Sequence, residues 1–194
     1  MILLRLLILF VLFFGLYSQA RPIEKIENGL KRVVELNTKF EKKGAVLSPE
    51  HVSELSNLSE EYIDFAEMAK KSFGFVWQSM KEEERKEAQT LLKRLLINSY
   101  VEKVAKARQG QIELLSESVS GDRAEVSSFV SEAGKKNKIE YRMRKSESSW
   151  RVVDVVIEGV SLVLNYRQEF NAIHKRGGIE AVLKSLREKI DSKE

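Results

Sequence analysis

The chain has 194 residues, of which 43% are apolar and 32% charged, and this composition is typical of a globular protein rather than a disordered one. The formal net charge of +4, without a concentrated stretch of lysine and arginine, argues against a nucleic-acid-binding protein. The sequence has no cysteine, which excludes disulfide bonds and cysteine metal sites, so we expect a fold stabilised by core packing.

A short apolar segment begins the chain. Residues 6–17 carry no charge, Arg5 precedes them, and a small-residue stretch ending at Ala20 follows them. Such a segment is too short to cross about 30 Å of hydrocarbon as a helix, and small residues behind it are typical of a cleavage site. We therefore predict that residues 1–20 are a secretory signal peptide cleaved after Ala20, with an uncleaved membrane anchor as the alternative. The mature chain, residues 21–194, would then be exported, most simply to the periplasm.

Helical periodicity dominates the next part of the chain. Residues 23–43 repeat apolar side chains at helical spacing and predict an amphipathic helix. The Ser-Pro pair at 48–49 predicts the start of a short second helix, and residues 62–69 predict a third. An S-x-x-E capping box beginning at Ser79 would open a long helix to about Arg108. The apolar stripe of that helix is too wide for one packing partner, so we expect it to contact two.

Beyond Gly110 the apolar pattern changes to the alternation of β-strands. The fourth predicted strand is apolar on both faces, which is typical of an interior strand. Straight alternation would place its Val152 and Val156 on the same face. A polar turn at residues 134–138 would precede the third strand. The four strands, joined as antiparallel hairpins, are predicted at 112–119, 124–130, 139–144 and 150–157.

After a turn at Gly159 the period returns to that of helices, and the glycine pair at 177–178 divides the last segment into two helices. The order is therefore N-terminal helices (23–108), a sheet (111–157) and C-terminal helices (160–191). This order predicts a single α+β domain in which a curved, antiparallel four-stranded sheet is wrapped by helices.

Few residues are candidates for chemistry. His51 and His174 have no second ligand at metal-binding spacing, so we expect both at the surface and predict no metal site and no cofactor. Asp154, on the interior strand, is either a buried general base or a structural residue that points to a strand edge or pairs with a cation on the neighbouring strand, such as Arg142 or Arg144. The sequence motifs of serine hydrolases and of phosphate-binding loops are absent. We therefore predict no catalytic residues.

The stretch that runs from the fourth strand into the last helices resembles a known family. Its residues are W-R-V-V-D-V-V-I-E-G-V-S-L-V at 150–163, N-Y-R-Q-E-F at 165–170, and the glycine pair followed by a helix at 177–190. Together they resemble the MlaC family of periplasmic phospholipid-binding proteins, also called toluene-tolerance auxiliary components.

Upstream segments extend this resemblance. Y-R-M-R at 141–144 and F-G-F-V-W at 73–77, followed by E-E-R at 83–85, are similar to features of the same family. The resemblance covers the chain from about Tyr62 to its end. It implies an NTF2-like fold, a highly curved sheet with helices that enclose a deep apolar cavity. It also implies a carrier, not an enzyme, that shuttles phospholipid through the periplasm between an outer-membrane lipoprotein complex and an inner-membrane ABC transporter complex.

A carrier of this kind must offer an apolar wall to the lipid. Two acyl chains of about 16 carbons would cost roughly 25 kcal/mol to expose to water, at about 0.8 kcal/mol per methylene group. One alternative is a binding protein for another apolar molecule, such as a hopanoid. A second is a small NTF2-like enzyme that uses Asp154 as a base. The predicted lining residues, with a possible one-residue error in strand register, are Leu92, Leu95, Tyr100, Ile112, Leu114, Val126, Tyr141, Met143, Val152, Val156, Val163, Tyr166 and Phe170.

Overall fold

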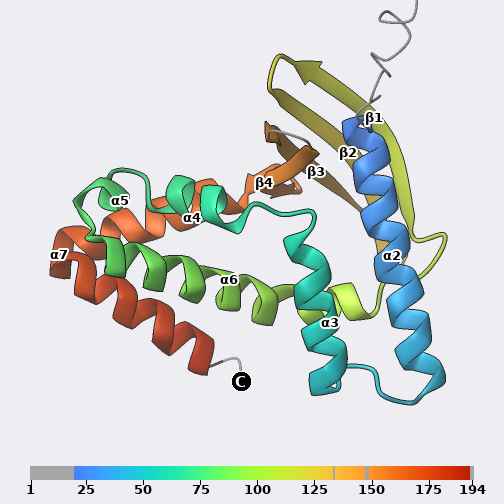
Figure 1. Cartoon of the computed structure of the whole chain (residues 1–194), viewed down its shortest axis with the longest axis horizontal. Helices are drawn as coiled ribbons and strands as arrows, with labels where there is room; N and C mark the ends of the chain where they lie inside the picture. The colour runs from blue at the N-terminus through green and yellow to red at the C-terminus, as the bar shows by residue number, and fades with distance from the viewer. Residues whose placement is uncertain (1–19, 133, 147–148, 193–194) are drawn as a thin grey trace, which may run out of the picture.

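The computed structural model describes residues 20–132, 134–146 and 149–192, so the predicted signal peptide, apart from Ala20, lies outside the described residues. The sheet with α2 and α3 forms one end of this α+β protein, α4, α5 and α7 form the other, and α6 runs between them (Figure 1). None of the described helices is long and apolar enough to span a membrane. The helices are α2 (Pro22–Lys42), α3 (Pro49–Glu60), α4 (Phe65–Phe73), α5 (Phe75–Ser79), α6 (Glu82–Ala105) and α7 (Leu162–Asp191).

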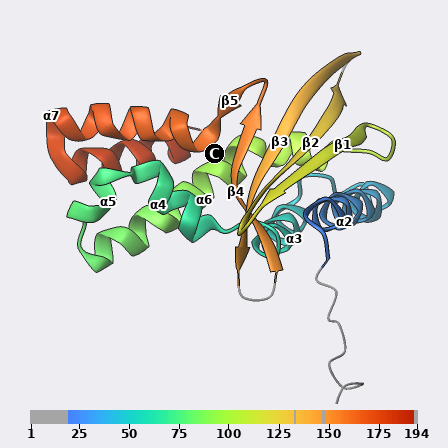
Figure 2. The same ribbon diagram turned by 90° about the horizontal axis from the view of Figure 1, so that it is seen from above.

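The strands form one antiparallel sheet in the order β1-β2-β3-β4-β5 (Figure 2). All four predicted strands are present, but the predicted number is corrected to five. The backbone has positive φ at Glu158 (49°) and Gly159 (79°), which turns the chain back so that Val160 pairs with Ile157. The strands are β1 (Ile112–Ser120), β2 (Arg123–Glu132), β3 (Lys135–Ser146), β4 (Ser149–Ile157) and β5 (Val160–Ser161).

The predicted polar turn at residues 134–138 is wrong. Strand β3 already begins at Lys135, which pairs with Glu132 on β2. Residues 135–138 lengthen the hairpin at its solvent-facing end, where polar side chains are compatible with strand structure.

The two faces of the sheet differ in polarity. Its inner face, the side that α2 covers, carries apolar residues such as Val126, Met143 and Val152, which belong to one cluster with Ile26 of α2. The outer face carries polar side chains such as Arg142. An apolar inner face and a polar outer face are typical of an antiparallel sheet that is covered by helices on one side.

A β-bulge interrupts β4. Neighbouring residues Arg142 and Met143 of β3 pair with Asp154 and Val152, so Val153 between them has no partner on β3. One extra residue reverses the alternation of side chains beyond it.

The bulge decides which residues of β4 face α2. Val152 lies on the inner face before the bulge, and Val155 lies there after it, paired with Tyr141 and packed in the same cluster. Val156 and Asp154 therefore point to the outer side. The prediction that Val152 and Val156 share a face is wrong, because it assumed straight alternation.

The start of α6 also differs from the prediction. The helix begins at Glu82 and not at Ser79. Its first turn is closed by the backbone N–H of Lys81, which donates to the Glu84 carboxylate at 2.7 Å. Glu82, the glutamate of the predicted box, is thus the first residue of the helix, and Glu84, two residues later, fills its role.

The third predicted helix starts later than expected because Ile63 forms a parallel β-bridge with Val152. The N–H of Val152 donates to the Tyr62 carbonyl at 2.8 Å, and the N–H of Asp64 donates to the Val152 carbonyl at 2.9 Å. This segment therefore runs beside the first half of β4, and α4 begins only at Phe65.

The described residues form two apolar clusters, one on the sheet and one among the helices at the other end. The sheet cluster joins the inner face to α2 and consists of the buried residues Ile26, Ala124, Val126, Met143, Trp150 and Val152. The helical cluster joins α4, α5, α6 and α7 around residues such as Phe73, Leu92, Phe170 and Leu186. The predicted break near the glycine pair is confirmed by Gly178 (φ 68°), where α7 folds back on itself (Figure 1). A wide stripe on α6 is consistent with its packing against α3, α4 and α7.

Gly29 brings α2 close to Tyr62. A Cβ at this position would lie 2.9 Å from two atoms of the Tyr62 ring, whose hydroxyl is fixed by donation to Asn28 at 2.7 Å. We expect Gly29→Ala to lower the melting temperature, although alanine favours helices over glycine by about 1 kcal/mol. Thermal unfolding checks this, with Lys31→Ala on the exposed side of α2 as the control. A Gly29→Ala protein as stable as the parent would contradict the close contact.

Candidate functional site

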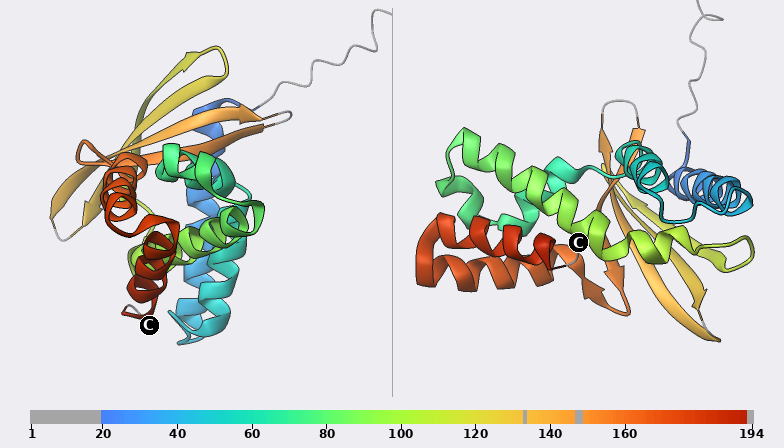
Figure 3. Two further views of the ribbon diagram at one scale, coloured as in Figure 1. Left: turned by 90° about the vertical axis from the view of Figure 1, so that its left-hand side faces the viewer. Right: turned by 90° about the horizontal axis from the view of Figure 1, so that it is seen from below.

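The inner face of the sheet is only partly covered. Ile26 of α2, which packs on this face, is only 4% exposed, but several apolar side chains of the face itself remain half-buried. Helix α6 passes under the sheet towards β1 (Figure 3), yet it packs extensively only on helices, not on the strands. The half-buried residues of this face are Ile112, Leu114, Val130, Ile139, Tyr141, Val155 and Ile157. We call this set the open inner face.

An open hollow lies where the inner face meets α2 at β1. It has a volume of about 420 Å³, and its apolar wall is formed by Leu30 and Val34 of α2 with Ile112 and Leu114 of β1. Charged side chains such as Lys31 stand at its edge. Its remaining wall is the connection from α6 to β1, residues 108–110. An apolar interior with a charged edge suits a ligand that has both an apolar and a polar part.

Two tyrosines lie on the helical cluster. Tyr100 of α6 and Tyr166 of α7 are half-buried against the helical cluster. Burial raises the pKa of Tyr166 to about 12, and the neighbouring Tyr100 and Glu169 add to the shift. Burial also raises the pKa of Tyr100 and of Tyr141. These phenols are therefore neutral at physiological pH and leave the wall uncharged.

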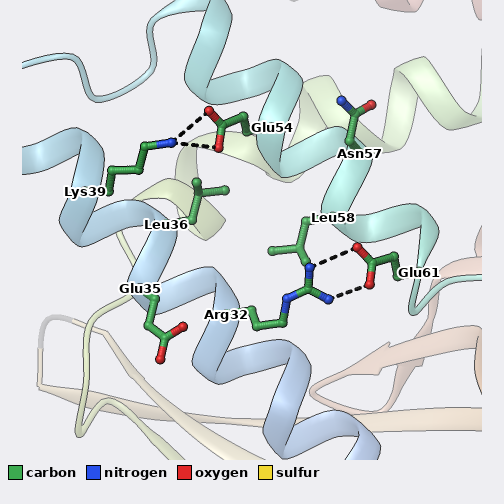
Figure 4. Close-up of a pocket in the computed structure, with 8 residues that line it drawn as sticks. All are labelled: Arg32, Glu35, Leu36, Lys39, Glu54, Asn57, Leu58 and Glu61. Atoms are coloured by element: carbon green, nitrogen blue, oxygen red, sulfur yellow. Dashed lines mark hydrogen bonds and ion pairs between the residues drawn. The ribbon is translucent and has the colours of Figure 1, made fainter.

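A second hollow, between α2 and α3, has a different character (Figure 4). Apart from Glu35, its charged side chains are paired across the helices. Arg32 donates to both oxygens of Glu61, and Lys39 contacts both oxygens of Glu54 at 3.1 and 3.2 Å. These pairs occupy polar groups that could otherwise bind a ligand. We therefore interpret this hollow as a gap between two packed helices and not as a binding site.

The predicted lining residues divide between the two clusters. The sheet cluster and the residues packed on it contain Leu114, Val126, Tyr141, Met143 and Val152. The helical cluster and the residues packed on it contain Leu92, Leu95, Tyr100, Val163, Tyr166 and Phe170. Ile112 and Leu114 line the open hollow, whereas Val156 is buried towards the outer side of the sheet. The structure thus places most of the predicted set in one of two apolar clusters.

The predicted enclosed cavity is not confirmed. The two hollows described above are both open to solvent, and several predicted lining side chains are completely buried by their neighbours. Phe170, for example, is 0% exposed and stacks on Phe73 with ring centroids 4.6 Å apart. The similarity to NTF2 likewise remains a prediction.

Asp154 has a structural role in this arrangement. Its carboxylate accepts hydrogen bonds from the Ser161 hydroxyl at 2.6 Å, from the Val163 N–H at 3.1 Å and from Arg142 at 3.3 Å. Ser161 in turn caps α7 by accepting from the N–H of Leu164 at 3.0 Å. The predicted ion pair with Arg142 is confirmed. Asp154 therefore fixes the start of α7 to the sheet.

Sequence reasoning missed the two apolar residues that α2 contributes to the hollow, Leu30 and Val34. Both belong to the apolar stripe of the first predicted helix, and that stripe is the signal that could have identified them. It did not say that α2 would lie across β1 and β2, because the contact is between segments far apart in the sequence.

Comparisons with known proteins identify relatives. The phospholipid-binding protein from Ralstonia solanacearum, solved in complex with a phospholipid, has a similar fold, with a TM-score of 0.72 and 23% sequence identity. The similarity covers 87% of this chain and 94% of that chain. Comparison with curated proteins gives no match. The family model described as MlaC protein matches residues 33–188. With four fifths of its length matched, the chain belongs to the MlaC family.

Proposed function

We propose that this protein is a periplasmic phospholipid carrier. Its mature form would be a single lipid-binding domain, residues 21–194, exported by a signal peptide that is cleaved after Ala20. It would shuttle lipid between outer-membrane and inner-membrane transport complexes through transient contacts with each. The observation that carries the proposal is the open inner face with its adjoining hollow, in a member of the MlaC family whose structural relative was solved with a phospholipid.

Both acyl chains would lie between the open inner face and the helices. Hydrocarbon tails cost roughly 25 kcal/mol to expose to water, at about 0.8 kcal/mol per methylene group, so a carrier must replace the membrane interior with a wall of similar polarity. Valine, leucine, isoleucine and neutral tyrosine side chains provide this wall. The charged edge of the hollow would leave the head group in contact with solvent.

A lipid-bound state requires the two clusters to separate. The sheet cluster and the helical cluster share no buried residue, although Ile63 packs against both, and α6 packs extensively on helices but not on strands. Movement of α6 away from the inner face would therefore break few packed contacts and would join the open inner face to the hollow. We propose that the NTF2-like cavity forms in this way when lipid enters.

The first experiment is to identify what the mature protein retains from cells. We expect native mass spectrometry and lipid extraction of washed protein to find about one phospholipid per chain. Protein that repeatedly lacks any apolar ligand, and that takes none up from phospholipid vesicles, would contradict the proposal. A bound terpenoid in place of phospholipid would support the role of the protein as a lipid carrier but would contradict the proposed ligand.

Adjacent leucines on β1 provide a matched test of the site. Leu114 lines the hollow, whereas Leu115, in the bulge of β1, is 41% exposed. We expect Leu114→Glu to reduce the retained lipid at least about tenfold, because a carboxylate cannot be buried against hydrocarbon without a partner. Leu115→Glu should retain as much lipid as the parent. Equal lipid content in both variants would place the lipid elsewhere.

A further inference from the structure

Two polar side chains are completely buried where α2, α3 and α6 meet. Asn37 of α2 and His51 of α3 are both 0% exposed, and the His51 ring stacks on Phe40 with centroids 4.5 Å apart. The expectation that His51 lies at the surface is therefore wrong. Buried polar groups of this kind are normally hydrogen-bonded, and both of these are.

The hydrogen bonds form a chain that fixes the tautomer of the neutral His51 ring. The N–H of Leu47 donates to His51 Nδ1 at 3.2 Å, so the proton is on Nε2, which donates to Asn37 Oδ1 at 3.0 Å. Asn37 Nδ2 then donates to the carbonyls of Val104 and Ala107 at 2.8 and 3.0 Å. Helix carbonyls at a C-terminus lack partners within the helix, and Asn37 supplies one for the end of α6.

This chain of hydrogen bonds lies beside the open hollow. The residues that follow Ala107, residues 108–110, form one wall of the hollow, and Val34, one turn before Asn37 on α2, forms another. Arg108 is also paired with Glu41 of α2 at 3.1 Å. Asn37 and this ion pair are therefore the groups that hold the α6–β1 connection against α2.

We propose that Asn37 and His51 form a proton-sensitive latch that holds the α6–β1 connection against α2 and so limits how far the open hollow can widen to admit an acyl chain. We call the arrangement in this structure, with the latch formed, the closed state. The inference rests on the proposed function, because it assigns to the latch the entry and exit of lipid at that site.

Protonation of His51 would oppose the closed state. With a proton on Nδ1, the ring would present a donor to the N–H of Leu47, and a buried cation would have no negative partner in hydrogen-bonding contact. Leu47 has a positive φ of 61°, a backbone conformation that leucine adopts at a cost. Loss of the hydrogen bond to His51 would therefore release both the ring and the loop that covers it.

The charged surroundings of His51 favour the neutral ring. Burial lowers the pKa of His51, Arg108 lowers it further, and Glu54 opposes them. Lys39 and Lys43 lie over the ring of Phe40 on which His51 stacks. Because the pKa is lower in the closed state than in an open one, the closed state is most stable above about pH 6.5. Its stability relative to the open state falls as the pH drops below that value.

The test is the rate at which labelled phosphatidylethanolamine moves from the mature protein to phosphatidylcholine vesicles. We expect the rate to rise between about pH 7.5 and about pH 5.5, by up to about tenfold for each pH unit below about 6.5. His51→Gln keeps a donor for Asn37 without a titrating group, so its rate should not depend on pH. His174→Gln removes the other histidine and should behave like the parent. Asn37→Ser should transfer lipid faster at all of these pH values.

Amide hydrogen exchange of the unaltered protein separates the latch from the lipid site. Exchange at Leu47 and at the end of α6 should accelerate as the pH falls, relative to the intrinsic rates, whether or not lipid is bound. If the protein holds no phospholipid but this acceleration occurs, the proposed function fails and the latch remains. A pH-independent exchange pattern, or a His51→Gln protein that keeps the pH response, would overturn the latch.

Discussion

Replacing Phe170 with alanine is expected to lower the free energy of unfolding by about 3–5 kcal/mol, as measured by urea denaturation. The side chain is 0% exposed and stacks on Phe73 at 4.6 Å and on Tyr166 at 5.6 Å between ring centroids. Its removal would leave a void in the helical cluster that the two remaining rings cannot fill by themselves.

Phe75→Ala provides the matched control. Phe75 is 51% exposed, and its ring contacts His174 edge-on at 5.8 Å. The same substitution there should change stability by less than about 0.5 kcal/mol. If Phe170→Ala lost lipid but kept its stability, Phe170 would belong to the lipid-facing wall that the sequence predicts and not to the permanent core.

Replacing Asp154 with alanine is expected to cost about 3 kcal/mol of stability, because hydrogen bonds to a charged group contribute about 1.5–3 kcal/mol each. The change removes the acceptor of the Ser161 hydroxyl and of the Val163 N–H, both of which are buried at the start of α7. Asp154→Asn keeps the shape and one acceptor oxygen, so it should cost less than alanine.

Asp122 is the control for Asp154. It is 56% exposed and pairs with Arg144 at 3.2 Å at the surface, so Asp122→Ala should change stability by less than about 1 kcal/mol. The comparison also tests the enzyme alternative. A base would lose turnover in Asp154→Asn at unchanged stability, whereas a structural carboxylate would lose stability.

The sequence predicts the elements of this fold well where local pattern decides them. The alternation of residues 112–157 and the long stripe of α6 indicate four strands and the central helix, and the glycine pair marks the fold-back of α7. The resemblance of residues 150–190 to the MlaC family predicts that the chain belongs to that family, and the family model confirms it. Each of these signals lies within one continuous stretch of chain.

The remaining features depend on contacts between distant segments. Nothing local to Tyr62 shows that it pairs with Val152, and nothing in the α3 stripe shows that His51 is buried by Asn37. The division of the predicted lining residues between two clusters also depends on contacts between distant segments. Whether Phe170 faces lipid or protein depends on how the helices close, and alternation or spacing does not determine that.

Because of the bulge at Val153, the number of residues in β4 determines which face of the sheet Asp154 occupies. In an uninterrupted strand Asp154 would follow Val152 onto the inner face and set a carboxylate among hydrocarbon tails; the extra residue turns it towards Arg142 and Ser161 instead. Whether β4 places a charge on the inner face therefore depends on the number of residues before Asp154 as well as on their identity. Replacing Val153 with another apolar residue would keep Asp154 on the outer face, whereas deleting Val153 would turn Asp154 to the inner face. This position should therefore be sensitive to insertions and deletions and insensitive to most substitutions.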